Sequence, residues 1–159
     1  MTYLISMNIK SLGAPPKFLA LKKFFLLARP KIIFIQETMH PSRVTLAFFK
    51  RMFPTWLMVA TEANGLSGGL AVLWDPVWIK AKAYKCCARI LISALVRGHV
   101  SMINFLNIYA PCRNRSPFWE RLFASGILDI ESLLLAGDLN VTLSPDECWG
   151  NCRKKRHFV

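Results

Sequence analysis

The sequence predicts a mixed α/β fold built on a large, partly antiparallel sheet. Strand-length apolar runs alternate with helix-like segments over roughly the first 60 residues, and four strand-like runs then follow one another from 68 to 110 with only short turns between them. The alternation predicts strands flanked by helices, and the successive hairpins predict antiparallel pairing. The 159 residues, 53% of them hydrophobic, suffice for one domain with a sizeable core.

Prolines mark the boundaries of the first elements. The expected order is a strand at 3–8, a helix from Pro15-Pro16 to about 28, a strand at 31–37, a helix from Pro41 to about 52 and a strand at 55–61. Pro is tolerated in the first turn of a helix, which explains both starts, and Pro30 ends the first helix. KIIFIQE, at 31–37, is rich in Ile and Phe, as expected of a buried strand.

The later elements are expected to be mainly strands. They are runs at 68–74, 77–84, 88–95 and 99–110, a helix capped by Ser116-Pro117 that extends to about 124, and the run LLLAGDLN at 133–140. VWIKAKAY, at 77–84, alternates apolar and basic residues, as a half-exposed antiparallel strand does. Asp75-Pro76 and Arg97-Gly98 are expected hairpin turns. A second layer that would cover the sheet is not evident in this pattern, so an exposed apolar face is expected.

The charge of the chain favours a polyanionic partner. Lys and Arg outnumber Asp and Glu by 21 to 9, for a formal net charge of +12, and the basic run at 153–157 contributes only four of these cations. Nucleic acid and an anionic membrane surface are the two partners that such a charge fits. An apolar run long enough for a membrane span and a signal peptide are both missing from the sequence, and five cysteines form an odd set. We therefore expect a nuclear or cytoplasmic protein with reduced thiols.

Three acidic residues directly follow strand-like runs: Glu37, Asp75 and Asp138. Strand ends of α/β sheets are where functional sites are built, and two converging carboxylates form a hard-oxygen site suited to Mg²⁺ or Mn²⁺. Asp75 precedes a proline and is explained by turn chemistry alone. Asp138, with Asn140, could also serve only to cap a turn, so the residues by themselves leave both interpretations open.

Four motifs occur in an order that resembles a known family. They are MNIKSLG at 7–13, FIQET at 34–38, LNIYAP at 106–111 and LLLAGDLN at 133–140. Together they resemble the endonuclease/exonuclease/phosphatase superfamily, and most of all the apurinic-endonuclease-like domain of plant LINE-type retrotransposons. The likeness extends from residue 3 to about 148, and includes SGGLAVLW at 67–74 and RNRSPFWERL at 113–122.

The resemblance implies a four-layer α/β sandwich that hydrolyses phosphodiesters with a divalent metal, Mg²⁺ or Mn²⁺, and no small-molecule cofactor. DNA is the implied partner. Glu37 would be the principal metal ligand and Asn8 would lie near the metal. Tyr109 would contact the phosphate, Asp138 would orient or activate the attacking water, and Asn140 would hydrogen-bond the scissile phosphate. These roles suit an in-line displacement, which requires charge neutralisation and a positioned nucleophile.

The family also has a late Ser-Asp-His-type motif, which this sequence does not contain. We therefore expect the first part of the four-layer fold, at residues 1–148, with the second part missing and an inactive site, followed by a disordered basic tail at 149–159. The alternative is a non-catalytic basic fragment that binds nucleic acid through its charge, or a remnant without function. A membrane-surface protein is the least supported alternative. The substrate within the phosphodiester class is left open.

Overall fold

The computed structural model describes residues 4–13, 15–64, 67–86 and 88–141. In chain order, its elements are β1 (Leu4–Asn8), α1 (Pro15–Ala28), β2 (Ile32–Gln36), α2 (Ser42–Lys50), β3 (Leu57–Ala60), β4 (Ala63–Asn64), β5 (Ser67–Gly68), β6 (Leu70–Trp74), β7 (Ile79–Cys86), β8 (Arg89–Val96), β9 (Met102–Tyr109), α3 (Ser116–Ala124), the 3₁₀ helix η1 (Ile127–Asp129) and β10 (Leu133–Asp138). The tail expected at 149–159 lies outside the described residues.

The strands form two four-stranded sheets of the same design and one small ribbon. The first sheet has the order β1-β2-β6-β3 and the second has the order β10-β9-β8-β7, while β4 pairs only with β5. In each large sheet one pair is parallel, β1 with β2 and β10 with β9, and the remaining pairs are antiparallel. Strands β1 and β10 are therefore the end strands of their sheets, each lying beside the strand to which it runs parallel.

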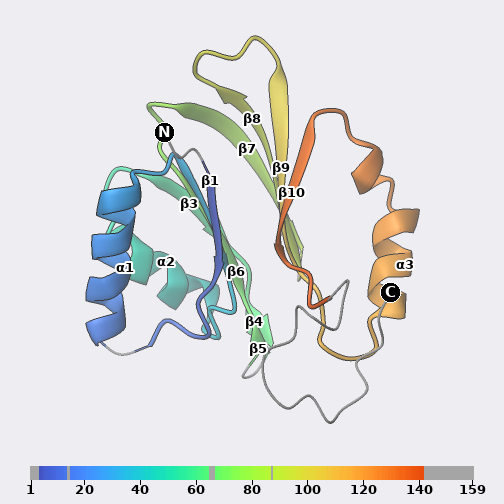
Figure 1. The fold of residues 1–159 in the computed structure, drawn as a ribbon, viewed down its shortest axis with the longest axis horizontal. Coiled ribbons are helices and arrows are strands. Elements are labelled where there is room, and N and C mark those ends of the chain that lie inside the picture. Colours follow the sequence, from blue (N-terminus) through green and yellow to red (C-terminus); the bar gives the residue numbers. More distant parts are fainter. Residues whose placement is uncertain (1–3, 14, 65–66, 87, 142–159) are drawn as a thin grey trace, which may run out of the picture.

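The two sheets pack face to face and bury an apolar core between them (Figure 1). From the first sheet the core takes alternate residues of β2 and β6, including Phe34 and Val72, and from the second it takes Ile90 and Ile92 of β8, all fully buried. Because side chains alternate across a strand, these residues share one face of each sheet. Every residue of β2 is buried, since both faces of its sheet are covered.

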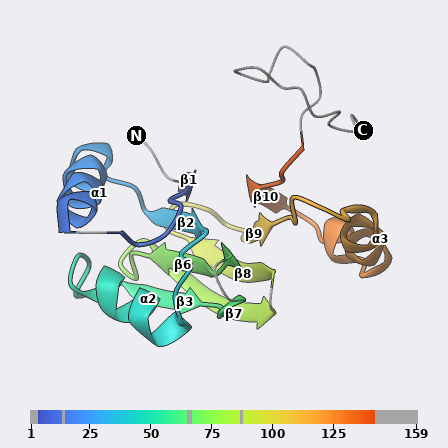
Figure 2. The same ribbon diagram turned by 90° about the horizontal axis from the view of Figure 1, so that it is seen from below.

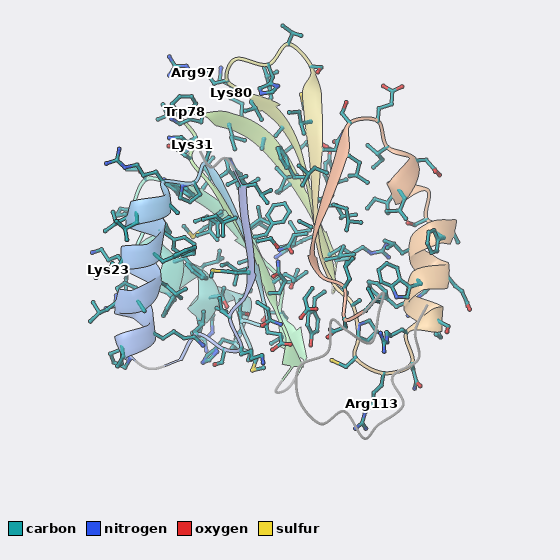
Figure 3. All side chains as sticks on the ribbon, in the orientation of Figure 1. Lys23, Lys31, Trp78, Lys80, Arg97 and Arg113 are labelled. Carbon is teal, nitrogen blue, oxygen red and sulfur yellow. The ribbon has the colours of Figure 1, made fainter. Side chains whose placement is uncertain are left out.

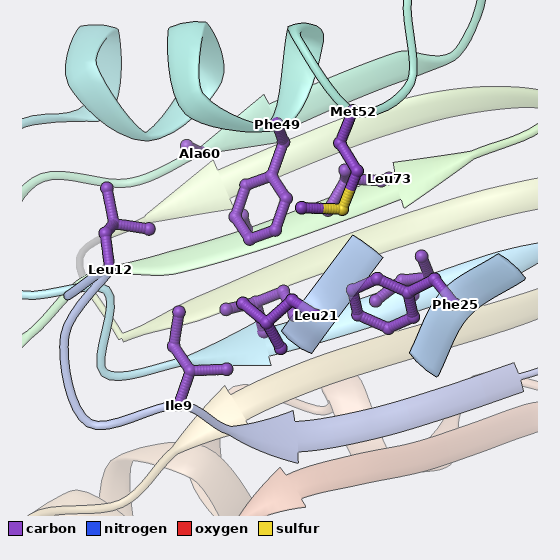
Figure 4. Close-up of a cluster of buried hydrophobic side chains, with 11 residues drawn as sticks. Ile9, Leu12, Leu21, Phe25, Phe49, Met52, Ala60 and Leu73 are labelled. Atoms are coloured by element: carbon purple, nitrogen blue, oxygen red, sulfur yellow. The ribbon is translucent and has the colours of Figure 1, made fainter. Parts of the chain in front are cut away.

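Helices complete the two outer layers (Figure 2). Helices α1 and α2 cover the first sheet, where Phe25 and Phe49 insert among Ile33, Ile35 and Leu73 (Figure 4). Helix α3 covers part of the second sheet, where its Leu122 packs on Leu106 and Ile108 of β9 and is fully buried. The order of layers is helix, sheet, sheet, helix, so the predicted four-layer α/β sandwich is confirmed.

Several sequence expectations need correction. The strands do not form one large sheet, because the chain leaves the first sheet after Trp74 and enters the second at Ile79. The expected exposed apolar face is also wrong, because the inner faces of the two sheets cover each other. The residue at the N-cap of α3 is Arg115 rather than Ser116, and it makes no side-chain capping bond. Within the described residues, no helix has the length and apolarity needed to cross a membrane.

Candidate active site

The first contact of the candidate site joins the ends of β1 and β10. Asn8 Nδ2 donates to Asp138 Oδ2 at 2.7 Å, and Asn8 Oδ1 accepts a bond of 3.0 Å from the backbone nitrogen of Lys10. The backbone nitrogen of Asn140 donates to Asp138 Oδ1 at 3.0 Å. Both carboxylate oxygens of Asp138 are thus engaged by neutral donors, which fix the orientation of this side chain.

The second contact joins the ends of β2 and β9. The Tyr109 hydroxyl donates to Glu37 Oε1 at 2.9 Å. Burial of the ring, followed by this bond to the carboxylate, raises the pKa of the Tyr109 phenol well above its usual value. Tyr109 therefore stays a neutral hydrogen-bond donor at physiological pH.

Strand register brings these two contacts together. Asn8 pairs with Gln36, the residue before Glu37, and Asp138 pairs with Tyr109. Neighbouring strands lie about 4.8 Å apart, so the four predicted residues Asn8, Glu37, Tyr109 and Asp138 form one ring at a single end of the sandwich. The structure therefore places together the residues that the sequence motifs singled out.

Asn140, the fifth predicted site residue, lies beside this ring but is occupied by backbone contacts. Its Nδ2 donates to the carbonyl of Ala110 at 2.6 Å, and Arg115 donates to its backbone carbonyl. Asn140 also adopts a positive φ of 50°, which is uncommon for a residue other than glycine. Arg115 was not predicted as a site residue, although it lies in the RNRSPFWERL segment.

Glu37 is held in a strained backbone conformation. Its φ is 53°, in the left-handed region, where side chains other than glycine are unfavourable. Its carbonyl accepts a bond of 2.6 Å from Ser11 N, and the next residue, Thr38, donates its backbone N–H to the carbonyl of Gly69 at 3.1 Å. Position 69 has no room for a side chain, because a Cβ on Gly69 would lie 2.2 Å from Thr38 Oγ1. The segment SGGL, at 67–70, thus supports the backbone at the end of β2, where Glu37 lies.

Lys17 supports the loop that follows Asn8. Its ammonium group donates to the carbonyl of Lys10 at 3.2 Å, to that of Ser11 at 2.9 Å, and also to that of Ile9. Lys10 and Ser11 have positive φ values of 46° and 78°, so this loop needs external support to keep its shape. The sequence pattern gave no sign of this role, because Lys17 lies in the first turn of an ordinary helix.

A buried polar pair locks the two sheets together directly behind the ring. Gln36 Nε2 donates to Asn107 Oδ1 at 2.7 Å, and Asn107 Nδ2 donates to the carbonyls of Ile35 at 3.3 Å and Ala71 at 3.1 Å. The two side chains are at most 1% exposed. Gln36 precedes Glu37 and Asn107 lies two residues before Tyr109, so this contact fixes the strands that carry the Glu37–Tyr109 pair.

The ring offers carboxylate oxygens suited to a hard divalent cation. The Tyr109 bond engages Oε1 of Glu37 and leaves Oε2 to other ligands. The described residues contain no group of three or more His, Cys, Asp or Glu side chains placed to hold a metal ion. Mg²⁺ is commonly held by one or two carboxylates and keeps several waters, so Glu37 fits Mg²⁺ or Mn²⁺ better than a metal that needs a full protein cage.

Comparison with known proteins shows which solved structures share this fold. No family model matches the chain, and its sequence matches no curated protein significantly. Solved structures do match. Danio rerio TDP2 in complex with a single-strand DNA product is 16% identical, with a TM-score of 0.68, and the match covers 89% of this chain and 61% of that one.

Two further matches are nucleases by their description. The endonuclease domain of TRAS1, a telomere-specific non-LTR retrotransposon, is 13% identical with a TM-score of 0.65, over 89% of this chain and 61% of that one. An AP endonuclease from Archaeoglobus fulgidus is 19% identical with a TM-score of 0.65, over 91% of this chain and 60% of that one. The chain thus spans about three fifths of the length of these structures. The described chain shares the fold of these solved structures, which is the fold that its resemblance to the endonuclease/exonuclease/phosphatase superfamily implied.

Proposed function

We propose that this chain provides the metal-binding and phosphate-binding part of a divalent-metal-dependent phosphodiesterase that acts on DNA. The observation that supports it best is the pairing at the site. Two carboxylates, Glu37 after β2 and Asp138 at the end of β10, lie at the same end of the sandwich, and each accepts a bond from a neutral side chain of the other sheet. The strained φ of Glu37 and Asn140 is a second support, because such strain is concentrated at functional sites.

Each residue of the ring has a role that its contacts allow. Glu37 would hold the divalent ion, which neutralises charge on the phosphate when bound. Tyr109, neutral because its pKa is raised, would keep the Glu37 carboxylate in place and present its hydroxyl to a phosphate oxygen. Asp138, held by Asn8, would accept the proton of the attacking water. Asn140 would bind the phosphate only after its amide exchanges the bond to Ala110.

Two observations support DNA as the substrate: the positive charge of the chain and the descriptions of the matched structures. The net charge of +12 attracts a polyanion. One matched structure contains a single-strand DNA product, and two others are described as endonucleases. The finer proposal, an endonuclease of a LINE-type retroelement, rests on the four sequence motifs.

A plasmid-nicking assay tests the proposal. Residues 1–159 are incubated with supercoiled plasmid and Mg²⁺ or Mn²⁺, and compared with the isosteric variant Glu37→Gln and with Glu120→Gln, an exposed carboxylate on α3. We expect nicking by the chain alone to be slow, because the described residues supply too few ligands to bind the metal tightly. Whatever nicking occurs should be lost in Glu37→Gln and retained in Glu120→Gln. Equal nicking by Glu37→Gln and the unmodified chain would contradict the proposal.

The second candidate function is nucleic-acid binding without cleavage, and the charge of the chain favours it. Binding that weakens steeply with salt, in the presence of EDTA, would be expected from either function. The two are separated by metal binding: the Mn²⁺ electron paramagnetic resonance signal should be quenched by the unmodified chain and not by Glu37→Gln. If the two proteins bind Mn²⁺ equally weakly, the non-catalytic function is the better account.

A further inference from the structure

The region between Asp75 and Glu120 has an unusual charge. It contains seven Lys and Arg residues and no acidic residue. Most of this region forms β7, β8 and β9 of the second sheet. Arg115 contacts Asn140 beside the candidate active site, whereas β7 and its lysines lie at the edge of the second sheet that is farthest from β10.

Two of the three lysines of β7 face outward, whereas the third, Lys85, donates to the carbonyl of Ala60 at the end of β3 at 3.0 Å. Ile79, Ala81 and Ala83 pack in the core between the sheets, so Lys80, Lys82 and Tyr84 lie on the opposite face of the strand. The two lysines are exposed and Tyr84 is 48% exposed. Lys82 Nζ lies 5.3 Å from the centre of the Tyr84 ring, within the range of a cation–π contact. The outward face of β7 is thus a row of two cations and an aromatic ring.

More cations lie at the end of the row where β7 begins (Figure 3). Lys31 Nζ is 4.4 Å and the Arg97 guanidinium is 5.4 Å from the centre of the Trp78 ring. Two positive charges beside one ring repel each other, and an anion placed there would relieve the repulsion. This end of the row is therefore suited to a phosphate.

A pocket lies at the other end of the row. It has a volume of about 540 Å³ and lies between the ends of β7 and β8 and the turn that follows α3. Tyr84, Leu91 and Ile127 give it an apolar wall, and Arg89 and Ser125 give it polar groups. Arg89 pairs in register with Ile108, the neighbour of Tyr109, so the pocket lies at the same end of the sheet as the candidate active site.

We infer that the outward face of β7 binds a single strand of nucleic acid, with phosphates on Lys80, Lys82 and Arg89 and a base stacked on Tyr84 at the pocket. Outward residues of a strand recur about every 6.7 Å, an extended array that a stretched sugar–phosphate chain can follow. Cations that track a backbone, combined with an exposed aromatic ring, are how proteins bind single strands without sequence preference. The inference does not depend on cleavage by the candidate active site.

Lysines on an end strand have a second use, since they deter pairing with strands of other molecules. Deterring strand pairing requires neither the Tyr84 ring nor the pocket. This alternative role of the lysines also predicts no preference for a nucleic-acid strand over any other polyanion. The two explanations therefore differ in what they predict for Tyr84.

The test is fluorescence anisotropy of a labelled oligothymidine in EDTA, with the whole chain and four variants. Tyr84→Ala should weaken binding about tenfold, because stacking on one ring contributes that much or more, whereas Tyr84→Phe should bind normally. Lys80→Gln/Lys82→Gln should weaken binding and reduce the salt dependence by about 0.7 per lost phosphate contact. The matched control is Lys22→Gln/Lys23→Gln, which removes two exposed cations from α1 on the opposite outer layer (Figure 3).

Equal losses in the two double-lysine variants would overturn the inference, because net charge would then explain the binding. Normal binding by Tyr84→Ala would overturn it too. Anionic vesicles that compete with the oligonucleotide as well as unlabelled oligothymidine does would point to a lipid surface and would also overturn it. The binding is measured in EDTA, without the metal ion that nicking requires, so failure of this inference can be told apart from failure of the proposed nuclease activity.

Discussion

Asn8 and Asp138 are hydrogen-bonded at 2.7 Å although they are 130 positions apart in the chain. The bond joins β1 of the first sheet to β10 of the second, and both are end strands. It is therefore a contact between sheets as well as within the candidate site. The geometry of the site and the packing of the two sheets consequently depend on each other.

Replacing Asn8 should affect stability in a way that depends on the residue introduced. Asn8→Ala removes this bond and the bond that Asn8 Oδ1 accepts from Lys10 N, for a combined loss of about 2 kcal/mol. Asn8→Asp places a second carboxylate against Asp138, and two ionised carboxylates at this distance repel. Asn8→Asp should therefore lose more stability than Asn8→Ala at pH 7. Urea unfolding of both variants measures this, and equal losses would argue against the contact.

The phenol of Tyr109 should titrate at unusually high pH. Burial and the Glu37 bond raise its pKa, so the absorbance difference between the unmodified chain and Tyr109→Phe should develop only above about pH 10, the usual phenol value. Because the folded pKa is the raised one, the stability due to this proton is complete below pH 10 and is lost as the pH rises towards the folded pKa. Glu37→Gln should move the titration to lower pH, because the charge of Glu37 is removed while burial of the ring and the neighbouring Cys112 still raise the pKa of Tyr109. A Tyr109 phenol that titrates normally in the unmodified chain would contradict the contact.

Much of the element order could be predicted from the sequence, but the arrangement of the sheets could not. Alternation and prolines locate the strands and helices to within a few residues. They do not say which strand lies beside which, and β6 and β7 are joined by the short Asp75-Pro76 turn that suggested a hairpin. In the structure Asp75 Oδ1 accepts a bond from Val77 N at 3.0 Å, so the turn exists, but it carries the chain from one sheet to the other.

The site residues could be predicted in part, because they belong to short motifs at strand ends. The residues that support the site could not be predicted, because their partners are either far along the chain or backbone carbonyls. Asn107 lies within the LNIYAP motif, yet nothing local shows that it is buried against Gln36, 71 positions away. Lys17 and Arg115 act through backbone carbonyls, which carry no sequence signal.

The buried Gln36–Asn107 pair should contribute strongly to stability. Asn107→Ala removes three hydrogen bonds and leaves the Gln36 amide without this partner inside the core, which should cost about 2 kcal/mol or more. Asn104→Ala is the matched control: it lies on the same strand, half-buried, and bonds to Ser93 and to the carbonyl of Glu131. We expect it to cost about 1 kcal/mol. Urea unfolding gives both values, and a smaller loss for Asn107→Ala than for Asn104→Ala would show that the pair does not lock the sheets.

Gly137 should be the least replaceable glycine of the described chain. Its φ is 144°, and an added Cβ would lie 1.9 Å from the carbonyl oxygen of Ile108 on the neighbouring strand. That atom belongs to the backbone of β9, so relief requires β10 to move away from β9 and to carry Asp138 with it. Gly98 is the matched control, because its φ of 89° is also unfavourable for alanine but nothing lies within 4 Å of its Cβ position.

Gly98→Ala should therefore report the cost of the backbone conformation alone, about 1 kcal/mol. Gly137→Ala should cost at least about 2 kcal/mol more, because a clash with backbone is added to that strain. It should also abolish any Glu37-dependent nicking or Mn²⁺ binding, since the strand that positions Asp138 is displaced, whereas Gly98→Ala should leave both unchanged. Thermal unfolding and the Mn²⁺ signal test this together. Equal stability of the two variants would mean that β10 does not pair with β9 as closely as the 1.9 Å approach requires.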